Sequence, residues 1–206
     1  MKEVLIQHME NFLNDFQYFR IDAYEAFEFP VKGGSKIVVL NATPYDDGLM
    51  VEIQLAIKIN KIEEIIFSFY NQEVDKLSLT YWEPLSQIHQ EITRRTFVQN
   101  ESQLNKLLAE LESALVKKGF GWLDALSKLE ELSNQLLKVI YSSTEKHPNL
   151  YKITQRSYVA LYLLGESMTE ALFYKYYEQM QFHKIPKHQL EEFLEFKKKL
   201  DNDLFK

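Results

Sequence analysis

The chain has no cysteine among its 206 residues. Disulfide bonds, thiolate metal sites and cysteine nucleophiles are therefore excluded. Glycine and proline are also sparse, with six and five copies, and they do not gather into a linker that would separate two domains. The residue set gives no positive reason to expect an oxidising compartment.

Long hydrophobic runs are missing as well. The longest apolar runs, such as 158–164, fall far short of the ~18–20 residues that a membrane-spanning helix needs. The first 16 residues carry charges at Lys2, Glu3, Glu10 and Asp15, which interrupt the apolar core that a signal peptide requires. We therefore expect no membrane association and a cytoplasmic location.

Positive charge is scarce in the first half of the chain. Residues 1–100 hold 9 Lys and Arg against 15 Asp and Glu, whereas residues 101–206 hold 15 of each. The whole formal net charge of −6 thus belongs to the first half. Because phosphate backbones attract basic surfaces, we expect no nucleic-acid partner. An acidic face suits a basic protein partner or a cation.

Two hydrophobic periods divide the chain. Apolar residues recur at helical spacing over 2–18, which predicts an N-terminal helix. From about 20 to 82 the period is two, which predicts strands near 20–29, 36–43, 51–59, 64–70 and 77–82. The clearest alternation sets Val51, Ile53 and Leu55 against Glu52 and Gln54. The connections are short, so neighbouring strands are predicted to be antiparallel.

The second half reads as helical. A short helix can follow Pro84, and Asn100 with Gln103 resembles a capping box at the start of a longer helix. Gly119 is predicted to end that helix in the left-handed conformation. Further helices are predicted over 122–141, over 155–181 and after Pro186, and Gly165 is interpreted as a close helix-packing point.

These patterns predict one α+β domain over residues 1–206. Its sheet part covers about 20–82 and its helical part about 100–206. The fold class is an N-terminal helix, a four- to five-stranded antiparallel meander, and a helical C-terminal half packed against the sheet.

No catalytic, metal or nucleotide signature stands out, so no cofactor is expected and the question of enzymatic activity stays open. His89-Gln90-Glu91 has the H-x-E spacing of zinc deaminases, but those enzymes also need a pair of cysteines. Adjacent carboxylates, as in Glu63-Glu64 and Glu191-Glu192, point in different directions and are predicted to be solvated.

Aromatic residues are the most unusual feature, with 14 Phe, 12 Tyr and 2 Trp. Most must belong to the core, but buried tyrosine hydroxyls need partners, so some rings are expected to line a cleft or an interface. The predicted helix over 155–181 is the richest segment, with Tyr158, Tyr162, Phe173, Tyr174, Tyr176 and Tyr177.

The order of elements resembles an uncharacterised family of bacterial α+β proteins of about this length. The residues that carry the resemblance are the 21–29 strand, the 51–59 strand, Tyr81-Trp82, and Gly119 followed by Trp122-Leu123. Such proteins have a leading helix, a meander and a helical tail. The resemblance implies a fold and no site, because the family has no agreed activity.

Two main hypotheses of function follow. In the first, the protein is a non-enzymatic cytosolic interaction module that neutralises a basic partner, as an immunity protein does, through the sheet-face residues Asp22, Tyr24, Glu28, Glu52 and Gln54. In the alternative, it is an enzyme or small-ligand binder with a pocket between sheet and helices near Trp82, His89, Arg94 and Arg95.

Two plainer interpretations stand beside these hypotheses. Arg94 and Arg95 could hold a carboxylate or phosphate, but they favour a structural ion pair with the acidic half over such an anion site. A homodimer that uses the aromatic surface for assembly alone is a third possibility.

Overall fold

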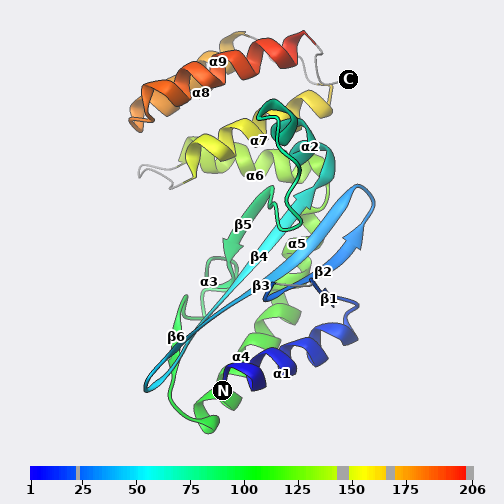
Figure 1. The fold of residues 1–206 in the computed structure, drawn as a ribbon, viewed down its shortest axis with the longest axis vertical. Helices are drawn as coiled ribbons and strands as arrows, with labels where there is room; N and C mark the ends of the chain where they lie inside the picture. Colours follow the sequence, from blue (N-terminus) through cyan, green and yellow to red (C-terminus); the bar gives the residue numbers. More distant parts are fainter. Residues whose placement is uncertain (22–23, 143–148, 166–169, 203–206) are drawn as a thin grey trace. The chain divides into compact units, whose positions relative to one another are not determined.

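A computed structural model of the chain describes residues 1–21, 24–142, 149–165 and 170–202 (Figure 1). Two compact units make it up. Unit 1 contains Met1–Lys58 and Tyr81–Ser127, and unit 2 contains Ile59–Thr80 and Lys128–Lys206. The chain therefore leaves the sheet after β4, returns to it, and leaves again after residue 127. The sequence-based prediction of a single folding domain stays a prediction.

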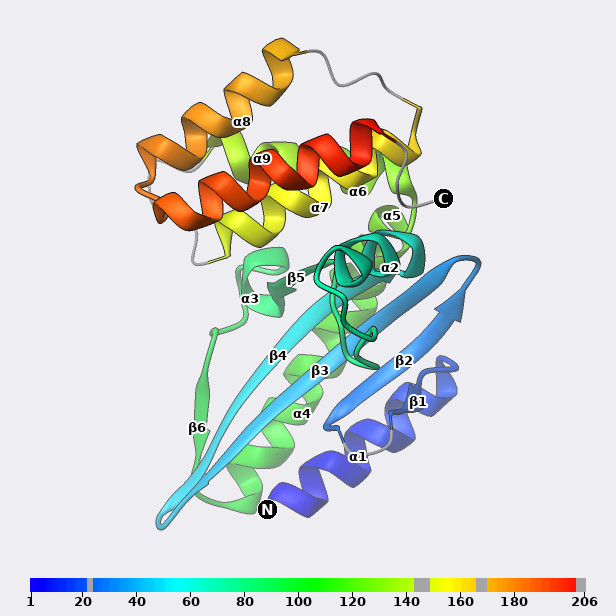
Figure 2. The ribbon, with the colours of Figure 1, turned by 45° about the horizontal axis from the view of Figure 1, so that its top comes forward.

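Unit 1 holds an antiparallel sheet, as the alternating pattern predicted. Its described strands follow the order β1-β2-β3-β4-β5, and a sixth short strand, β6, pairs with β4 beside the tip of the β3–β4 hairpin (Figure 2). The elements are α1 (Lys2–Asp15), β1 (Phe19–Arg20), β2 (Ala26–Val31), β3 (Gly34–Tyr45), β4 (Gly48–Ile59), β5 (Tyr81–Pro84), α3 (Leu85–Ile88) and β6 (Thr96–Val98). The predicted α+β class with a leading helix is confirmed.

Helices cover one face of this sheet. α4 (Glu101–Ala114), the π-helical turn η1 (Leu115–Gly119) and α5 (Phe120–Leu126) form one continuous helical run. Asn100 caps its start, because its side chain accepts a hydrogen bond from the Gln103 backbone N–H at 3.0 Å. The prediction that Gly119 ends this helix is wrong: its φ is −60°. A Cβ at Gly119 would lie 3.1 Å from Leu55 of β4, so the glycine allows close helix–sheet packing instead.

Gly48 at the start of β4 lies close to β6, and this contact gives a testable prediction. A Cβ there would lie 2.6 Å from the Val98 carbonyl oxygen and 2.6 Å from the Phe97 ring of β6. Gly48→Ala is expected to lower the free energy of unfolding of unit 1 by about 1–3 kcal/mol, because β6 must shift.

Tryptophan fluorescence measures this change selectively, since Trp82 and Trp122 both belong to unit 1. Gly121→Ala is the matched control, because a Cβ at Gly121 of α5 meets nothing within 4 Å. We expect that variant to be as stable as the parent or more stable by up to ~1 kcal/mol. Equal destabilisation by both substitutions would contradict the assignment.

Unit 2 is helical. It consists of α2 (Asn60–Phe69), α6 (Leu129–Ser142), α7 (Leu150–Leu163), α8 (Glu170–Phe182) and α9 (Lys187–Asp201). α7 contacts α2, α6, α8 and α9, and ten of its residues are buried, so it is the central helix of the unit. None of the described helices combines the length and the apolar character that a membrane crossing requires.

α2 corrects the predicted strand over 64–70. The segment is rich in isoleucine and phenylalanine, which favours a strand by composition. Ile62, Ile65, Ile66 and Phe69 are buried and recur every three or four residues, however, so they form the inner side of a helix. The predicted 77–82 strand is correspondingly displaced to β5 at Tyr81–Pro84.

The single helix predicted over 155–181 is in fact two helices, α7 and α8. Gly165 follows the end of α7 with a φ of +74°, and a Cβ there would meet nothing within 4 Å. It is therefore a helix-ending glycine and not the packing point that the sequence suggested. Pro186 precedes α9, as predicted.

Candidate functional site

The residues predicted for the sheet face lie as follows. Asp22 is outside the described residues, and Tyr24 lies in the bend between β1 and β2. Glu28 is opposite Ile37 in the β2–β3 ladder and accepts a hydrogen bond from Ser35. Glu52 and Gln54 both line one groove on β3 and β4, which shows that they share a face of the sheet.

Part of the second predicted set lies on this same face. Trp82 is opposite Ala56, two residues along β4 from Gln54, and Arg95 lines the groove with Glu52. Arg94 and Arg95 both bind Glu52, which is the structural ion pair that the sequence favoured for them. The imidazole of His89 lies 3.5 Å from Glu91 and does not contact the arginines.

These contacts change the electrostatics of the predicted acidic face. The Glu52 side chain is 6% exposed, and two guanidinium groups neutralise it. Burial alone would raise the pKa of its carboxyl, but the hydrogen bonds and charges of Arg95 and Arg94 outweigh burial and lower that pKa. Glu52 is therefore ionised at neutral pH and is not free to meet a basic partner.

Three of the six aromatic residues listed for the predicted 155–181 helix belong to the core. Tyr158 and Tyr176 are 1% and 0% exposed, and Phe173 is buried, whereas Tyr174 is exposed. The ring of Phe173 stacks on Phe193 of α9 with centroids 5.6 Å apart. The tyrosines that line a pocket come from elsewhere in unit 2.

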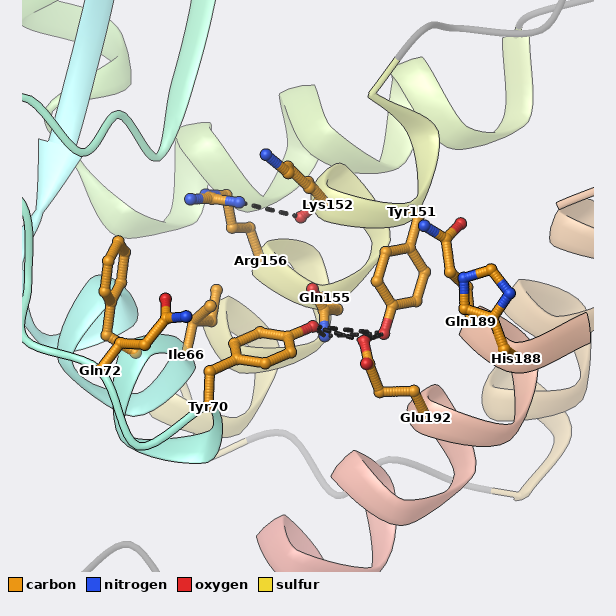
Figure 3. A pocket seen from close by; sticks show the side chains of 11 residues that line it. Ile66, Tyr70, Gln72, Tyr151, Lys152, Gln155, Arg156, His188, Gln189 and Glu192 are labelled. Carbon is orange, nitrogen blue, oxygen red and sulfur yellow. Dashed lines mark hydrogen bonds between the residues drawn. The ribbon is translucent and has the colours of Figure 1, made fainter. Parts of the chain in front are cut away.

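That pocket has a volume of about 300 Å³ and is built from α2, α7 and α9 together with the segment after α2 (Figure 3). This volume is at the small end of the ~300–1,000 Å³ range of ligand pockets. Its lining residues are Ile66, Phe67, Tyr70, Gln72, Tyr151, Lys152, Gln155, Arg156, His188, Gln189 and Glu192.

Four polar side chains meet inside it. The hydroxyl of Tyr70 donates to Oε1 of Glu192 at 2.6 Å, and the hydroxyl of Tyr151 donates to the same oxygen. The amide nitrogen of Gln155 donates to the Tyr70 and Tyr151 hydroxyl oxygens at 2.9 Å and 3.1 Å. Gln155 is 1% exposed, so one buried amide fixes both phenols against one carboxylate oxygen (Figure 3).

The two phenols are hydrogen-bond donors and not proton sources. Burial raises the pKa of Tyr70, and its hydrogen bond to Glu192 raises it further. Burial also raises the pKa of Tyr151 strongly, and Glu192 adds to that effect. Both hydroxyls therefore stay protonated at neutral pH, and the arrangement is suited to holding a ligand.

The arginine beside the pocket is already paired. Arg156 binds Glu63 through Nε at 3.0 Å and through a terminal nitrogen at 2.7 Å. Glu63 is 0% exposed and also accepts a hydrogen bond from Thr80 at 2.9 Å. The prediction that Glu63 is solvated is wrong, because it faces the interior of unit 2 from α2. Its charge cancels that of Arg156.

Glu192 has no such counter-ion. Within the described ranges, its contacts are the two neutral phenols on Oε1, and no cation pairs with it. Oε2 has no hydrogen-bond partner among those residues. Lys152 lines the same pocket, but Figure 3 shows it pointing away from Glu192. The pocket therefore presents one uncompensated negative charge between aromatic rings.

Sequence reasoning missed all four residues of this network. Tyr70 was assigned to the end of a strand, and Glu192 was dismissed as half of a solvated pair. One usable signal existed: Tyr151 and Gln155 are four residues apart, which places them on the same side of a helix. The contribution of Tyr70 and Glu192 depends on the packing of α2 and α9 against α7, and no local pattern encodes it.

No metal site is evident, since no three His, Asp or Glu residues come together in the described part of the chain in a way that suits an ion. Comparison with protein-family models, curated proteins and solved structures finds no match. The resemblance of pattern to bacterial α+β proteins thus stays a prediction, and the site geometry has to carry the functional argument.

Proposed function

We propose that the protein binds a small organic cation in the pocket formed by Tyr70, Tyr151, Gln155 and Glu192. The observation that carries this proposal is the carboxylate of Glu192, which receives only neutral donors and leaves Oε2 without a partner among the described residues. An ammonium or guanidinium group would donate to Oε2 and supply the missing positive charge.

The aromatic rings fit the same ligand class. A cation within about 6 Å of a ring centroid is attracted to the face of that ring. Tyr70 and Tyr151 supply two rings beside the carboxylate, and Phe67 and Ile66 line the pocket as apolar surface. The ligand would then have a charged nitrogen near Glu192 and a short apolar body.

A basic protein partner at the sheet face has less support. That hypothesis needs exposed carboxylates, but Glu52 is buried and bound by two arginines. The raised phenol pKa values likewise support binding over proton transfer in the pocket. Of the two main sequence-based hypotheses, the geometry supports the small-ligand alternative. The pocket that supports it belongs to unit 2 and is not the predicted pocket near Trp82, His89, Arg94 and Arg95.

Calorimetric titration of the full chain with benzylamine and putrescine tests the proposal. Both amines are expected to bind saturably, while benzyl alcohol and benzoate do not. Glu192→Gln keeps the shape of the side chain but removes the charge, so amine affinity should fall about 10- to 100-fold, since hydrogen bonds to charged groups contribute ~1.5–3 kcal/mol.

Glu191→Gln is the control. Glu191 is the neighbouring carboxylate on α9, exposed and paired with Lys187 at 3.3 Å, and it does not line the pocket. Its substitution should leave amine affinity unchanged. Equal binding of benzyl alcohol, equal effects of the two substitutions, or no amine binding would each refute the proposal.

A further inference from the structure

A second surface, independent of the pocket, lies on the open face of the sheet in unit 1. Its centre is Glu52 of β4, whose oxygens accept hydrogen bonds from Nε of Arg94 at 3.1 Å and from Nε of Arg95 at 2.8 Å. The carboxylate is 6% exposed, while the arginine side chains are 57% and 62% exposed. One buried negative charge therefore holds two outward-facing positive charges.

Each arginine has donors left over. A guanidinium group carries five N–H donors, and Glu52 occupies only the Nε–H of each. The terminal nitrogens of Arg94 and Arg95 make no hydrogen bond to any residue that the structure describes. Because Glu52 fixes both Nε atoms, it also fixes the direction in which the free N–H groups point. The cluster is an oriented donor set with a net charge of +1.

The surface beside the arginines is a shallow groove of about 360 Å³. It is lined by Asn41, Thr43, Tyr45, Met50, Glu52, Gln54 and Arg95. At the hairpin end, Tyr45 and Phe97 form an edge-to-face pair with centroids 5.9 Å apart, and they are 56% and 36% exposed. Exposed aromatic residues, methionine and arginine together are the composition of protein–protein interfaces.

We propose that this groove docks an acidic segment of a partner protein. Carboxylates of the segment would be held by the free N–H groups of Arg95, which lines the groove, and of Arg94, which shares Glu52 with it. The apolar side chains of the segment would pack on Met50, Tyr45 and Phe97. Asp46 and Asp47 occupy the turn next to Tyr45, so like-charge repulsion keeps the acidic residues of the segment toward the arginine end.

The charges that line the groove indicate the sign of the charge that the partner segment should carry. The first half of the chain is acidic as a whole, which favoured a basic partner on sequence alone. Within the groove, however, the single acidic lining residue is the buried Glu52, and its charge is already compensated. A lysine-rich segment would meet the exposed guanidinium group of Arg95 there and would be repelled.

Two peptides of opposite charge test the proposal on the full chain: acetyl-Glu-Phe-Glu-Leu-Glu-amide and its counterpart with lysine in place of glutamate. Both carry a fluorescent label, and binding is followed by anisotropy. The acidic peptide is expected to bind at least ~10-fold more tightly, with an affinity that falls as salt increases. Trp82 lies on the same face and gives a second readout.

Arg95→Gln should weaken the acidic peptide at least ~10-fold. Arg94 then still pairs with Glu52, so the buried carboxylate keeps a partner and the fold survives. Arg20→Gln is the matched control, because Arg20 belongs to the same unit but lies on β1, 3.6 Å from Glu10. Its substitution should leave peptide affinity unchanged.

Glu52→Gln distinguishes binding by oriented arginine donors from non-specific electrostatic attraction of the acidic peptide. It raises the net charge of the cluster, so non-specific attraction would bind the acidic peptide more tightly. If the arginines act as an oriented donor set, loss of the Glu52 carboxylate removes their alignment, and the acidic peptide should bind more weakly. Tighter binding by Glu52→Gln, preference for the lysine peptide, or no effect of Arg95→Gln would each overturn it.

Discussion

Replacing Arg156 with leucine is expected to lower the free energy of unfolding of unit 2 by about 3–5 kcal/mol. The reason is the carboxylate that the substitution leaves behind. Glu63 is 0% exposed, and Arg156 supplies two of the three hydrogen bonds that it accepts from other side chains. Without the guanidinium, a buried charge retains only the Thr80 hydroxyl, and water cannot reach it.

The loss should be largely reversed by removing the other partner as well. The double variant Glu63→Leu/Arg156→Leu replaces the ion pair by apolar side chains, a change that is often neutral or stabilising in other buried pairs. We therefore expect its unfolding free energy to lie much closer to the parent than to Arg156→Leu. The double-mutant cycle then gives a large coupling between the two residues.

Helix circular dichroism during denaturation is the appropriate measurement. Both tryptophans belong to unit 1, so their fluorescence should change little in these variants and serves as an internal reference. Lys152→Leu is the control, since Lys152 lies one turn before Arg156 on α7 and its side chain is exposed. A loss below ~1 kcal/mol for Arg156→Leu would show that Glu63 does not depend on its partner.

The sequence identified the fold class because both hydrophobic periods are strong. The 51–59 alternation matches β4, and the capping pair Asn100 and Gln103 matches the start of α4. Two of the wrong predictions concern glycine. Gly119 was predicted to stop a helix and Gly165 to pack closely, yet the structure reverses the two assignments. A glycine without structural context shows only that a Cβ is unneeded, and not whether space or backbone angle is the reason.

The candidate sites show a second limit. Glu52 and Arg95 were named from the sequence, but in two separate hypotheses, because the residues are 43 positions apart. The structure joins them in one ion pair. Tyr70 directly follows α2, Tyr151 belongs to α7 and Glu192 to α9, so their meeting depends on the packing of α2 and α9 against α7. Periodicity describes which side of an element is apolar, and it does not describe which elements meet.

Raising the pH above about 10 is expected to destabilise the protein steeply, and unit 2 more than unit 1. Tyr18, Tyr151 and Tyr158 are 2%, 8% and 1% exposed. Burial raises the pKa of all three hydroxyls, with further increases from Asp124, Glu192 and Asp201 respectively. In the unfolded chain these phenols ionise near pH ~10.

The sign follows from linkage. A group whose pKa is higher in the folded state stabilises that state fully below the unfolded pKa, and this contribution is lost as pH rises toward the folded pKa. Above pH ~10 the unfolded chain releases protons that the folded chain keeps. Each tyrosine then costs about 1 kcal/mol between pH ~10 and ~11, or roughly 3 kcal/mol for the three together, and the loss approaches about 1.4 kcal/mol per tyrosine for each further pH unit.

The two units separate this effect from general alkaline denaturation. The pKa of Tyr18 is raised in unit 1, whereas those of Tyr70, Tyr141, Tyr151 and Tyr158 are raised in unit 2. The helical signal should therefore respond to pH more steeply than tryptophan fluorescence does. Tyr158→Phe keeps the ring in its cluster with Phe193 and Phe196 and should remove one tyrosine's share of the pH-dependent slope in unit 2. Tyrosinate absorbance is the direct check. All tyrosines could instead ionise near pH ~10 while the helical signal stays intact. The buried phenols would then have ordinary pKa values, and the prediction would be wrong.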